Sequence, residues 1–236
     1  MKNLKEIKEF IKEGVYDPGI LKAFFLAGGP GSGKSFVTRN AFAGSGLKVV
    51  NSDNFFERGL RKANLSLSMP DDESYFRDII RRKAKQTTAT ALDQYVTGRL
   101  GLVIDGTARD YDAIARQHSM LNNMGYDSYM IFVNTSLDVA LERNAQRERS
   151  VPEYITRKSH ATVQSNMGRL QRLFGNRNFI VIDNSASDKE LVTQTLQKCN
   201  RTVASLLRAP INNYLGKNWI KRELEARKRT WDLKSL

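Results

Sequence analysis

A short run near the start of the chain combines glycines, a lysine and a hydroxyl in a pattern that binds phosphate. With the residue after it, the run consists of Gly28, Gly29, Pro30, Gly31, Ser32, Gly33, Lys34, Ser35 and Phe36. Glycines allow backbone N–H groups to wrap around an anion, and the positive end of a following helix faces the same anion. We expect Lys34 to reach the β- and γ-phosphates of a nucleotide and Ser35 to ligate Mg²⁺. The run predicts an ATP site, although by itself it allows an ATPase, a GTPase or a kinase.

A carboxylate that could act as a base lies just after the second apolar segment. Asp53 follows the run that ends at Val50. Ligands of open α/β folds bind beyond the carboxyl ends of the strands, so a carboxylate placed there can accept a proton from an attacking hydroxyl. Position alone equally allows Asp53 to be the N-cap of the next helix, with Asn54 as an alternative cap.

Short apolar runs alternate along the chain with longer segments that suit helices. The runs are Ala23 to Ala27, Leu47 to Val50, Leu100 to Ile104, Tyr129 to Val133 and Phe179 to Ile182. An unbroken apolar run is typical of a strand buried on both faces, and strands separated by helices form parallel sheets. We therefore predict a three-layer α/β domain with a five-stranded, mainly parallel sheet.

The chain divides into three parts by composition. Residues 1–20 carry apolar side chains at helical spacing among Lys and Glu, which predicts an N-terminal helix. Residues 21–209 form the main domain, and its segment at about 139–160 is basic and helical in pattern. Residues 210–236 form a basic C-terminal segment, in which Lys217 to Lys234 has seven basic and three acidic residues and predicts a basic helix.

The charge of the whole chain suggests a polyanionic partner. There are 38 Lys and Arg against 25 Asp and Glu, for a formal net charge of +13. Charge alone leaves DNA, RNA and anionic small molecules open. No apolar run is long enough to cross a bilayer and no secretory signal is visible, so we expect a cytoplasmic protein without a membrane partner. The single cysteine, Cys199, is expected to be a packing residue.

From about residue 20 to residue 185, the sequence resembles the P-loop kinases that include the 5′-kinase domain of polynucleotide kinase and the zeta-toxin kinases. The resemblance implies a P-loop kinase fold with a helical lid, ATP and Mg²⁺ as cofactors, and Asp53 as the general base. The third apolar run ends in an acid, Gly, Thr, any residue and Arg, as in zeta toxins, whereas polynucleotide kinases place the acid directly before the Thr. That similarity implies that Asp105 helps to hold Mg²⁺ and that Thr107 and Arg109 contact the acceptor. Alternatively, Asp105 only ends a strand.

The segment Val139 to Pro152 is similar to the polynucleotide kinase lid, where an Arg-Asn pair is followed by basic residues and Val-Pro. A lid arginine can lie against the transferring phosphoryl and offset its charge. The similarity implies Arg147 as the first candidate, Arg143 as the second and Arg149 as the third, although spacing alone favours a solvated basic helix face. Residues Ile182 to Ser185 lie where related kinases form the adenine-side loop.

The two resemblances imply different acceptors, namely a nucleic-acid hydroxyl or the sugar hydroxyl of an amino-sugar nucleotide. Charge favours nucleic acid, because cations occur in the lid, in the C-terminal segment and in the cluster Arg81, Arg82, Lys83 and Lys85. DNA is therefore the predicted partner. The acceptor is either a hydroxymethyl group on a modified pyrimidine such as 5-hydroxymethyluracil, as in some bacteriophage DNA kinases, or a 5′ end. The alternatives are a small-molecule kinase and a DNA-stimulated P-loop ATPase, and the sequence leaves the oligomeric state open.

Overall fold

A parallel sheet forms the centre of the computed structural model, which describes residues 14–67, 71–147, 151–185 and 189–234. Its strands are β1 (Lys22–Ala27), β2 (Lys48–Val50), β3 (Leu102–Asp105), β4 (Asp127–Asn134) and β5 (Phe179–Asp183). They form one five-stranded sheet in the order β2-β3-β1-β4-β5, and every pairing is parallel. Every residue of the central strand β1 is buried. The predicted parallel sheet is confirmed.

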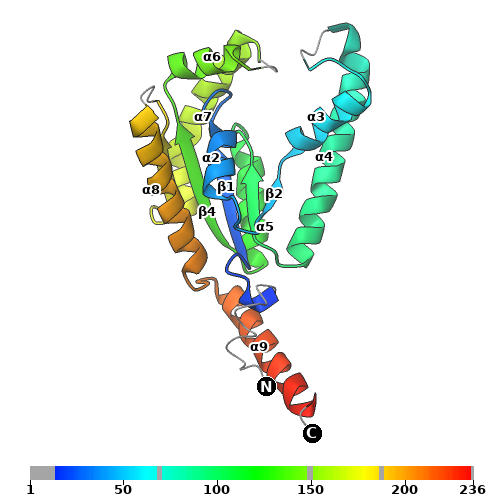
Figure 1. Cartoon of the computed structure of the whole chain (residues 1–236), viewed down its shortest axis with the longest axis vertical. Coiled ribbons are helices and arrows are strands. Elements are labelled where there is room, and N and C mark those ends of the chain that lie inside the picture. The colour runs from blue at the N-terminus through cyan, green and yellow to red at the C-terminus, as the bar shows by residue number, and fades with distance from the viewer. Residues whose placement is uncertain (1–13, 68–70, 148–150, 186–188, 235–236) are drawn as a thin grey trace.

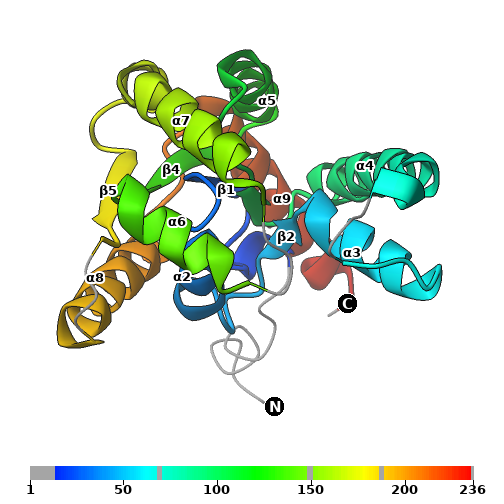
Figure 2. The same cartoon turned by 90° about the horizontal axis from the view of Figure 1, so that it is seen from above.

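Helices cover both faces of the sheet (Figure 2). On one face lie α2 (Lys34–Ala41) and α8 (Lys189–Arg208), where Val37 and Cys199 pack against Phe24. On the other face lie α5 (Tyr111–Asn123) and α7 (Glu153–Phe174), which pack against Phe25. The sheet and these two helical layers make the three layers predicted from the sequence, and Cys199 is buried as expected of a packing residue.

Two helices form an arm that stands beside the edge strand β2 (Figure 1). They are α3 (Ser52–Lys62) and α4 (Ser74–Thr97), with the short 3-10 helix η2 (Asp71–Glu73) before α4. Phe56, Leu60 and Ala84 form a small core between them. We call this pair the α3–α4 arm. It places the start of α3, which carries Asp53, opposite the loop that precedes α2.

The two ends of the described chain lie far from the carboxyl edge of the sheet. Helix α9 (Tyr214–Lys234) extends from the opposite end of the molecule (Figure 1), beside the 3-10 helix η1 (Gly14–Tyr16). The guanidinium of Arg99 lies 4.8 Å from the ring centre of Trp219, which docks the start of α9 on the domain. The predicted basic C-terminal helix is present, whereas most of the predicted N-terminal helix lies outside the described residues. Within the described ranges, no helix is long and apolar enough to span a membrane.

A buried lysine joins the sheet to the end of α8. Lys22 is 1% exposed, and its Nζ donates to the carbonyl oxygens of Leu206, Leu207 at 2.8 Å and Ala209 at 2.5 Å. Because Lys22→Met removes the buried ammonium that donates to three part-buried carbonyl oxygens, we expect it to lower the free energy of unfolding by about 2–4 kcal/mol. Urea denaturation measures the change, with the exposed Lys48→Met as a matched control. Equal midpoints for the two variants would contradict a stabilising role for these hydrogen bonds.

Candidate active site

The phosphate-binding run folds as a tight loop between β1 and the start of α2. Gly31 and Gly33 have φ values of +76° and +90°, a region that favours glycine. A Cβ atom on Gly31 would lie 2.0 Å from the carbonyl oxygen of Ala140, so no larger residue fits. Helix α2 begins at Lys34, and the N–H groups of its first turn therefore face the hollow of the loop.

The loop is braced from the ends of two neighbouring strands. The carbonyl oxygen of Ser32 accepts hydrogen bonds from Thr135 Oγ1 at 3.0 Å and from Asn184 Nδ2 at 2.8 Å. Thr135 follows β4 and Asn184 follows β5. The loop is thus held rigidly, which favours a site that is formed before the nucleotide arrives.

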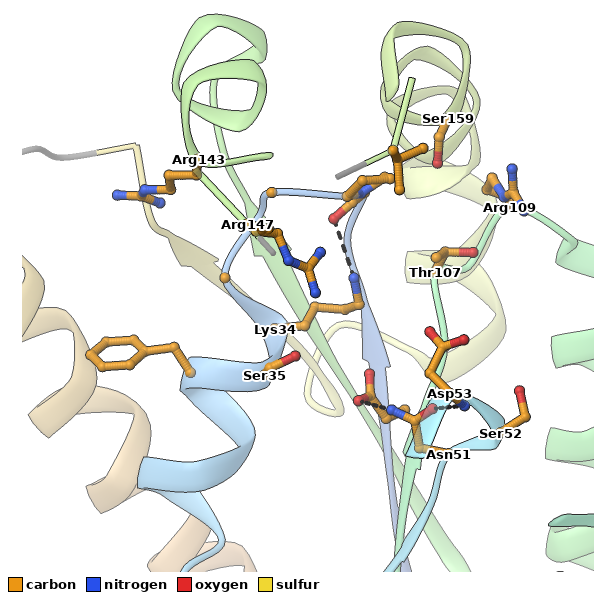
Figure 3. A pocket seen from close by; sticks show the side chains of 18 of the residues that line it. Lys34, Ser35, Asn51, Ser52, Asp53, Thr107, Arg109, Arg143, Arg147 and Ser159 are labelled. Carbon is orange, nitrogen blue, oxygen red and sulfur yellow. Dashed lines mark hydrogen bonds between the residues drawn. The ribbon is translucent and has the colours of Figure 1, made fainter. Parts of the chain in front are cut away.

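Lys34 lies among the charged groups that the sequence assigns to catalysis. Its Nζ donates to the carbonyl oxygens of Gly28 at 2.5 Å and Gly29 at 3.2 Å. Burial lowers the pKa of Lys34 to about 8, while Asp105 opposes and Arg147 adds to this shift. In Figure 3, Arg147 points toward Lys34. The loop lysine, the first-choice lid arginine and the strand-end acid therefore interact within one site.

An asparagine connects the carboxylate of Asp105 to the backbone of Asp53. Asn51 Nδ2 donates to Asp105 Oδ2 at 2.7 Å, and Asn51 Oδ1 accepts from the backbone N–H of Asp53 at 2.7 Å (Figure 3). Asn51 is therefore the N-cap of α3, and neither Asp53 nor Asn54 has that role. Burial raises the pKa of Asp105, and Lys34 and the hydrogen bond from Asn51 oppose the shift. Asn51 was not predicted as a site residue, although asparagine directly before a helix is a recognisable capping signal.

The side chain of Asp53 is oriented by the α3–α4 arm. Arg81 Nη1 lies 2.7 Å from Asp53 Oδ1, and the Arg81 guanidinium lies 3.5 Å from the ring centre of Phe56. Only part of the basic cluster on α4 belongs to the site, since Arg81 and Lys85 line it whereas Arg82 and Lys83 do not.

The lid arginines differ in where they point. Arg143 Nη1 donates to the carbonyl oxygen of Asn184 at 2.7 Å, and Figure 3 shows this side chain turned away from Lys34. The third candidate, Arg149, lies outside the described residues. Arg143 connects the lid to the loop after β5, so Arg147, and not Arg143, is the arginine of this pair that points toward Lys34.

The loop after β3 is held in an unusual conformation. Ala108 is buried with a φ of +62°, which costs an alanine about 1–3 kcal/mol. The buried side chain of Asn166 offsets this cost by donating to the carbonyl oxygens of Ala108 at 3.1 Å and Arg109 at 2.9 Å. The bend sets where Thr107 and Arg109 lie, and both line the site.

These groups surround one cavity of about 790 Å³. It is lined by most of the residues that the sequence singled out, namely Gly29, Pro30, Gly31, Gly33, Lys34, Ser35, Phe36, Asp53, Asp105, Thr107, Arg109, Arg143 and Arg147. Gly28 and Ser32 shape the loop behind it. Seven further lining residues were not predicted as site residues, and Arg81 and Lys85 had no defined role in the site from the sequence. The seven are Arg39, Asn51, Ser52, Gly106, Val151, Ile155 and Ser159.

The donor set suits Mg²⁺ bound together with nucleotide phosphates. Ser35 offers a hydroxyl and Asp105 a carboxylate, and both line the cavity. Within the part of the chain that the structure describes, no cluster of three His, Cys, Asp or Glu side chains could hold a metal by itself. Mg²⁺ in kinase sites is held by one or two carboxylates together with phosphate oxygens and water. These residues therefore fit the ion.

The braced glycine loop, the helix behind it and the parallel sheet define a P-loop domain of the kinase type, a class of phosphotransferases. The chain belongs to the AAA_33 family of AAA domains, whose profile matches residues 24–173. No curated protein matches the sequence.

Several solved structures are similar to the chain. A complex of AvrRxo1-ORF1 with AvrRxo1-ORF2 is 12% identical with a TM-score of 0.54, over 87% of this chain and 89% of that chain. The PezAT toxin–antitoxin system of Streptococcus pneumoniae is 17% identical with a TM-score of 0.52, over 87% and 93%. A gluconokinase from Sinorhizobium meliloti is 16% identical with a TM-score of 0.47, over 79% and 96%. At these identities the similarity concerns the fold alone.

The lowered pKa of Lys34 predicts a pH-dependent affinity for nucleotide. A bound phosphate favours the ammonium form, and Lys34 loses its proton as the pH rises through about 8. Affinity for ADP should therefore be constant below that pH and fall above it, by at most about tenfold per pH unit. Calorimetric titrations at several pH values measure this. Lys34→Arg stays charged and should abolish the fall, so an equal fall in that variant would assign it to another group.

Proposed function

We propose that the protein transfers the γ-phosphoryl group of ATP to an alcohol. The observation that carries this proposal is the convergence of Lys34, Arg147, Asp105 and Asp53 on one cavity beside a braced phosphate-binding loop. Phosphoryl transfer depends mainly on positioning and on charge stabilisation, and this cavity offers both.

Each group has a defined part in the proposed reaction. The acceptor oxygen forms a bond to the γ-phosphorus, the bond to the β–γ bridging oxygen breaks, and ADP leaves. Asp53 takes the proton of the acceptor hydroxyl, and Arg81 holds the Asp53 carboxylate in place. Lys34 and Arg147 offset the negative charge that develops around the phosphorus. Mg²⁺ held by Ser35 and Asp105 would neutralise charge on the β- and γ-phosphates.

For the acceptor, we propose a hydroxyl on DNA, either the hydroxymethyl group of a modified pyrimidine or a 5′ end. The net charge of +13 supports this choice, and so do Arg81, Lys85 and Arg109 in the wall of the cavity. A small anionic acceptor such as an amino-sugar nucleotide is the second candidate. It is favoured by the position of α9, because this basic helix lies at the other end of the molecule and does not extend the cavity (Figure 1).

Label transfer from γ-labelled ATP distinguishes the candidates. The acceptors, tested in parallel, are plain DNA, 5′-hydroxyl DNA, hydroxymethylpyrimidine DNA and an amino-sugar nucleotide. Labelled polymer supports the DNA kinase, and a labelled small molecule supports the second candidate. Label released only as phosphate would overturn the kinase proposal and leave a DNA-stimulated ATPase.

Helix α9 provides a separate test of DNA binding. We expect changing its exposed cations to Gln to flatten the salt dependence of DNA affinity, by about one unit of log–log slope for each DNA phosphate that is no longer neutralised. The variant carries Lys217→Gln, Lys221→Gln, Arg222→Gln and Lys228→Gln. Affinity for ATP should not change, since the nucleotide site lies at the opposite end of the sheet. An unchanged slope would exclude DNA binding by these cations of α9.

A further inference from the structure

A second cavity adjoins the candidate active site on the side of α5 and α7. Its volume is about 690 Å³. It shares Arg109, Ile155 and Ser159 with the wall of the first cavity, so the two cavities meet at these residues. A molecule that presents a hydroxyl to Asp53 could therefore place its remaining part in the second cavity.

One wall of the second cavity is a single face of α7. The residues Ile155, Lys158, Ser159, Thr162, Asn166 and Arg169 line it at spacings of three and four. This face bears hydroxyl, amide and cationic groups, which are suited to a polar, anionic ligand. Tyr154 adds an aromatic ring at the rim and is 72% exposed.

The charges of the second cavity leave two cations for a ligand. Asp110 is occupied as the N-cap of α5, where it accepts a hydrogen bond from the N–H of Ala113 at 2.9 Å. Asp112 lies 3.7 Å from Arg169, so these two charges offset each other. Within the described ranges, no acidic side chain pairs with Arg109 or Lys158. Arg109 lies where the cavities meet, and Lys158 lines the second cavity next to Ser159 in sequence.

A buried hydroxyl at the junction also lacks a partner. Ser159 is 1% exposed, and its Oγ has no hydrogen-bond partner among the described residues. Figure 3 shows this hydroxyl on the side of the site that holds Thr107 and Arg109. A ligand at the junction would supply the hydrogen bond that this buried hydroxyl lacks.

We propose that the second cavity binds a nucleotide unit of the acceptor, with its phosphate between Arg109 and Lys158 and its base against Tyr154. Tyr154 and Lys158 are four residues apart on α7 and so lie on one face of the helix. The inference rests on the proposed function for its biological meaning. A nucleotide unit occurs both in a DNA strand and in a nucleotide-linked sugar, so the cavity suits either acceptor candidate.

The cavity is distinct from the position of the nucleotide donor. Arg143, which donates to the carbonyl oxygen of Asn184, is on the other side of Lys34 from Arg109 and Ser159 (Figure 3). A non-hydrolysable ATP analogue at saturation should therefore occupy the loop and leave the second cavity open.

The test is calorimetric binding of thymidine 5′-monophosphate in the presence of that analogue. Lys158→Gln should weaken binding by about tenfold, because it removes a charge-assisted hydrogen bond to phosphate. Tyr154→Leu should weaken it by about fivefold or more, because leucine cannot stack on the base. Arg157→Gln is the matched control and should change it less than about twofold, since Arg157 pairs with Glu153 on the exposed surface of the same helix. Thymidine, which has no phosphate, should bind equally to wild type and Lys158→Gln.

Two results would overturn the second site. One is that the ATP analogue competes with thymidine monophosphate, and the other is that Lys158→Gln and Arg157→Gln behave alike. A hexathymidylate and a uridine-diphosphate sugar identify the source of the nucleotide unit, because the true source should bind more tightly than the mononucleotide. Binding is measured without any transfer. A second site that binds nucleotide in a protein unable to phosphorylate any acceptor would therefore overturn the proposed function alone.

Discussion

Lys34→Ala is expected to slow phosphoryl transfer by about a thousandfold, because it removes one of the cations that offset the charge accumulating at the phosphoryl group in the transition state. The Lys34 ammonium group lies within the phosphate-binding loop, and its charge interacts with those of Asp105, Arg147 and Asp53. Single-turnover kinetics with γ-labelled ATP measure the decrease directly, once an acceptor has been identified.

Two controls separate charge from folding in this experiment. Lys34→Met keeps most of the apolar stem of the lysine side chain and should be as slow as Lys34→Ala. The melting temperatures of both variants show whether the protein with the altered loop is still folded. Lys85→Ala removes another lysine from the wall of the same cavity. It should raise the KM of the acceptor more than it lowers kcat, because Lys85 lies on α4 on the side of Asp53. A folded Lys34→Ala protein that turns over normally would disprove the P-loop assignment.

The parts of the site that the sequence predicted are those set by local pattern and parallel topology. The glycine run determines its own loop because the loop needs positive φ at Gly31 and Gly33. Asp53 and Asp105 could be placed together since each lies at the carboxyl end of a strand, and the ends of parallel strands meet at one edge of the sheet. Five apolar runs were enough to predict the sheet and its layers.

The interactions that the sequence did not predict depend on how distant elements pack. Arg81 meets Asp53 across the α3–α4 arm. Whether Arg81 faces Asp53 depends on how α4 is rotated about its axis, and the apolar pattern of so exposed a helix does not specify that rotation. Nothing in the sequence identifies Ser159 as a site residue. Its hydroxyl belongs to the site only because α7 packs beside the loop after β3, which carries Arg109.

Charge composition gave the least spatial information. From the sequence, the basic C-terminal segment counts with the lid and the Arg81 cluster as one of several basic patches that could contact nucleic acid. Helix α9 instead lies at the opposite end of the sheet from the phosphate-binding loop (Figure 1). A net charge does not say where on the molecule the charged residues lie. Because α9 lies far from the phosphate-binding loop, any role of α9 in DNA binding is separate from the chemistry at Asp53.

Asp53→Asn should reduce kcat by about a hundredfold or more, because the amide cannot take up the acceptor proton at neutral pH. ATP affinity should be nearly unchanged, since Asp53 lies across the cavity from the phosphate-binding loop (Figure 3). The melting temperature should also be retained, because Asn51 rather than Asp53 caps α3.

The neighbouring Arg81 makes this prediction specific. Arg81→Gln breaks the ion pair with Asp53 but leaves the carboxylate able to accept a proton. If Asp53 is the base, Arg81→Gln should be clearly faster than Asp53→Asn, and the double variant should be about as slow as Asp53→Asn alone. If Asp53 serves only to hold the arm through Arg81, the two single variants should be equally impaired and equally destabilised. Rates and melting temperatures of the three variants therefore decide between a base and a structural ion pair.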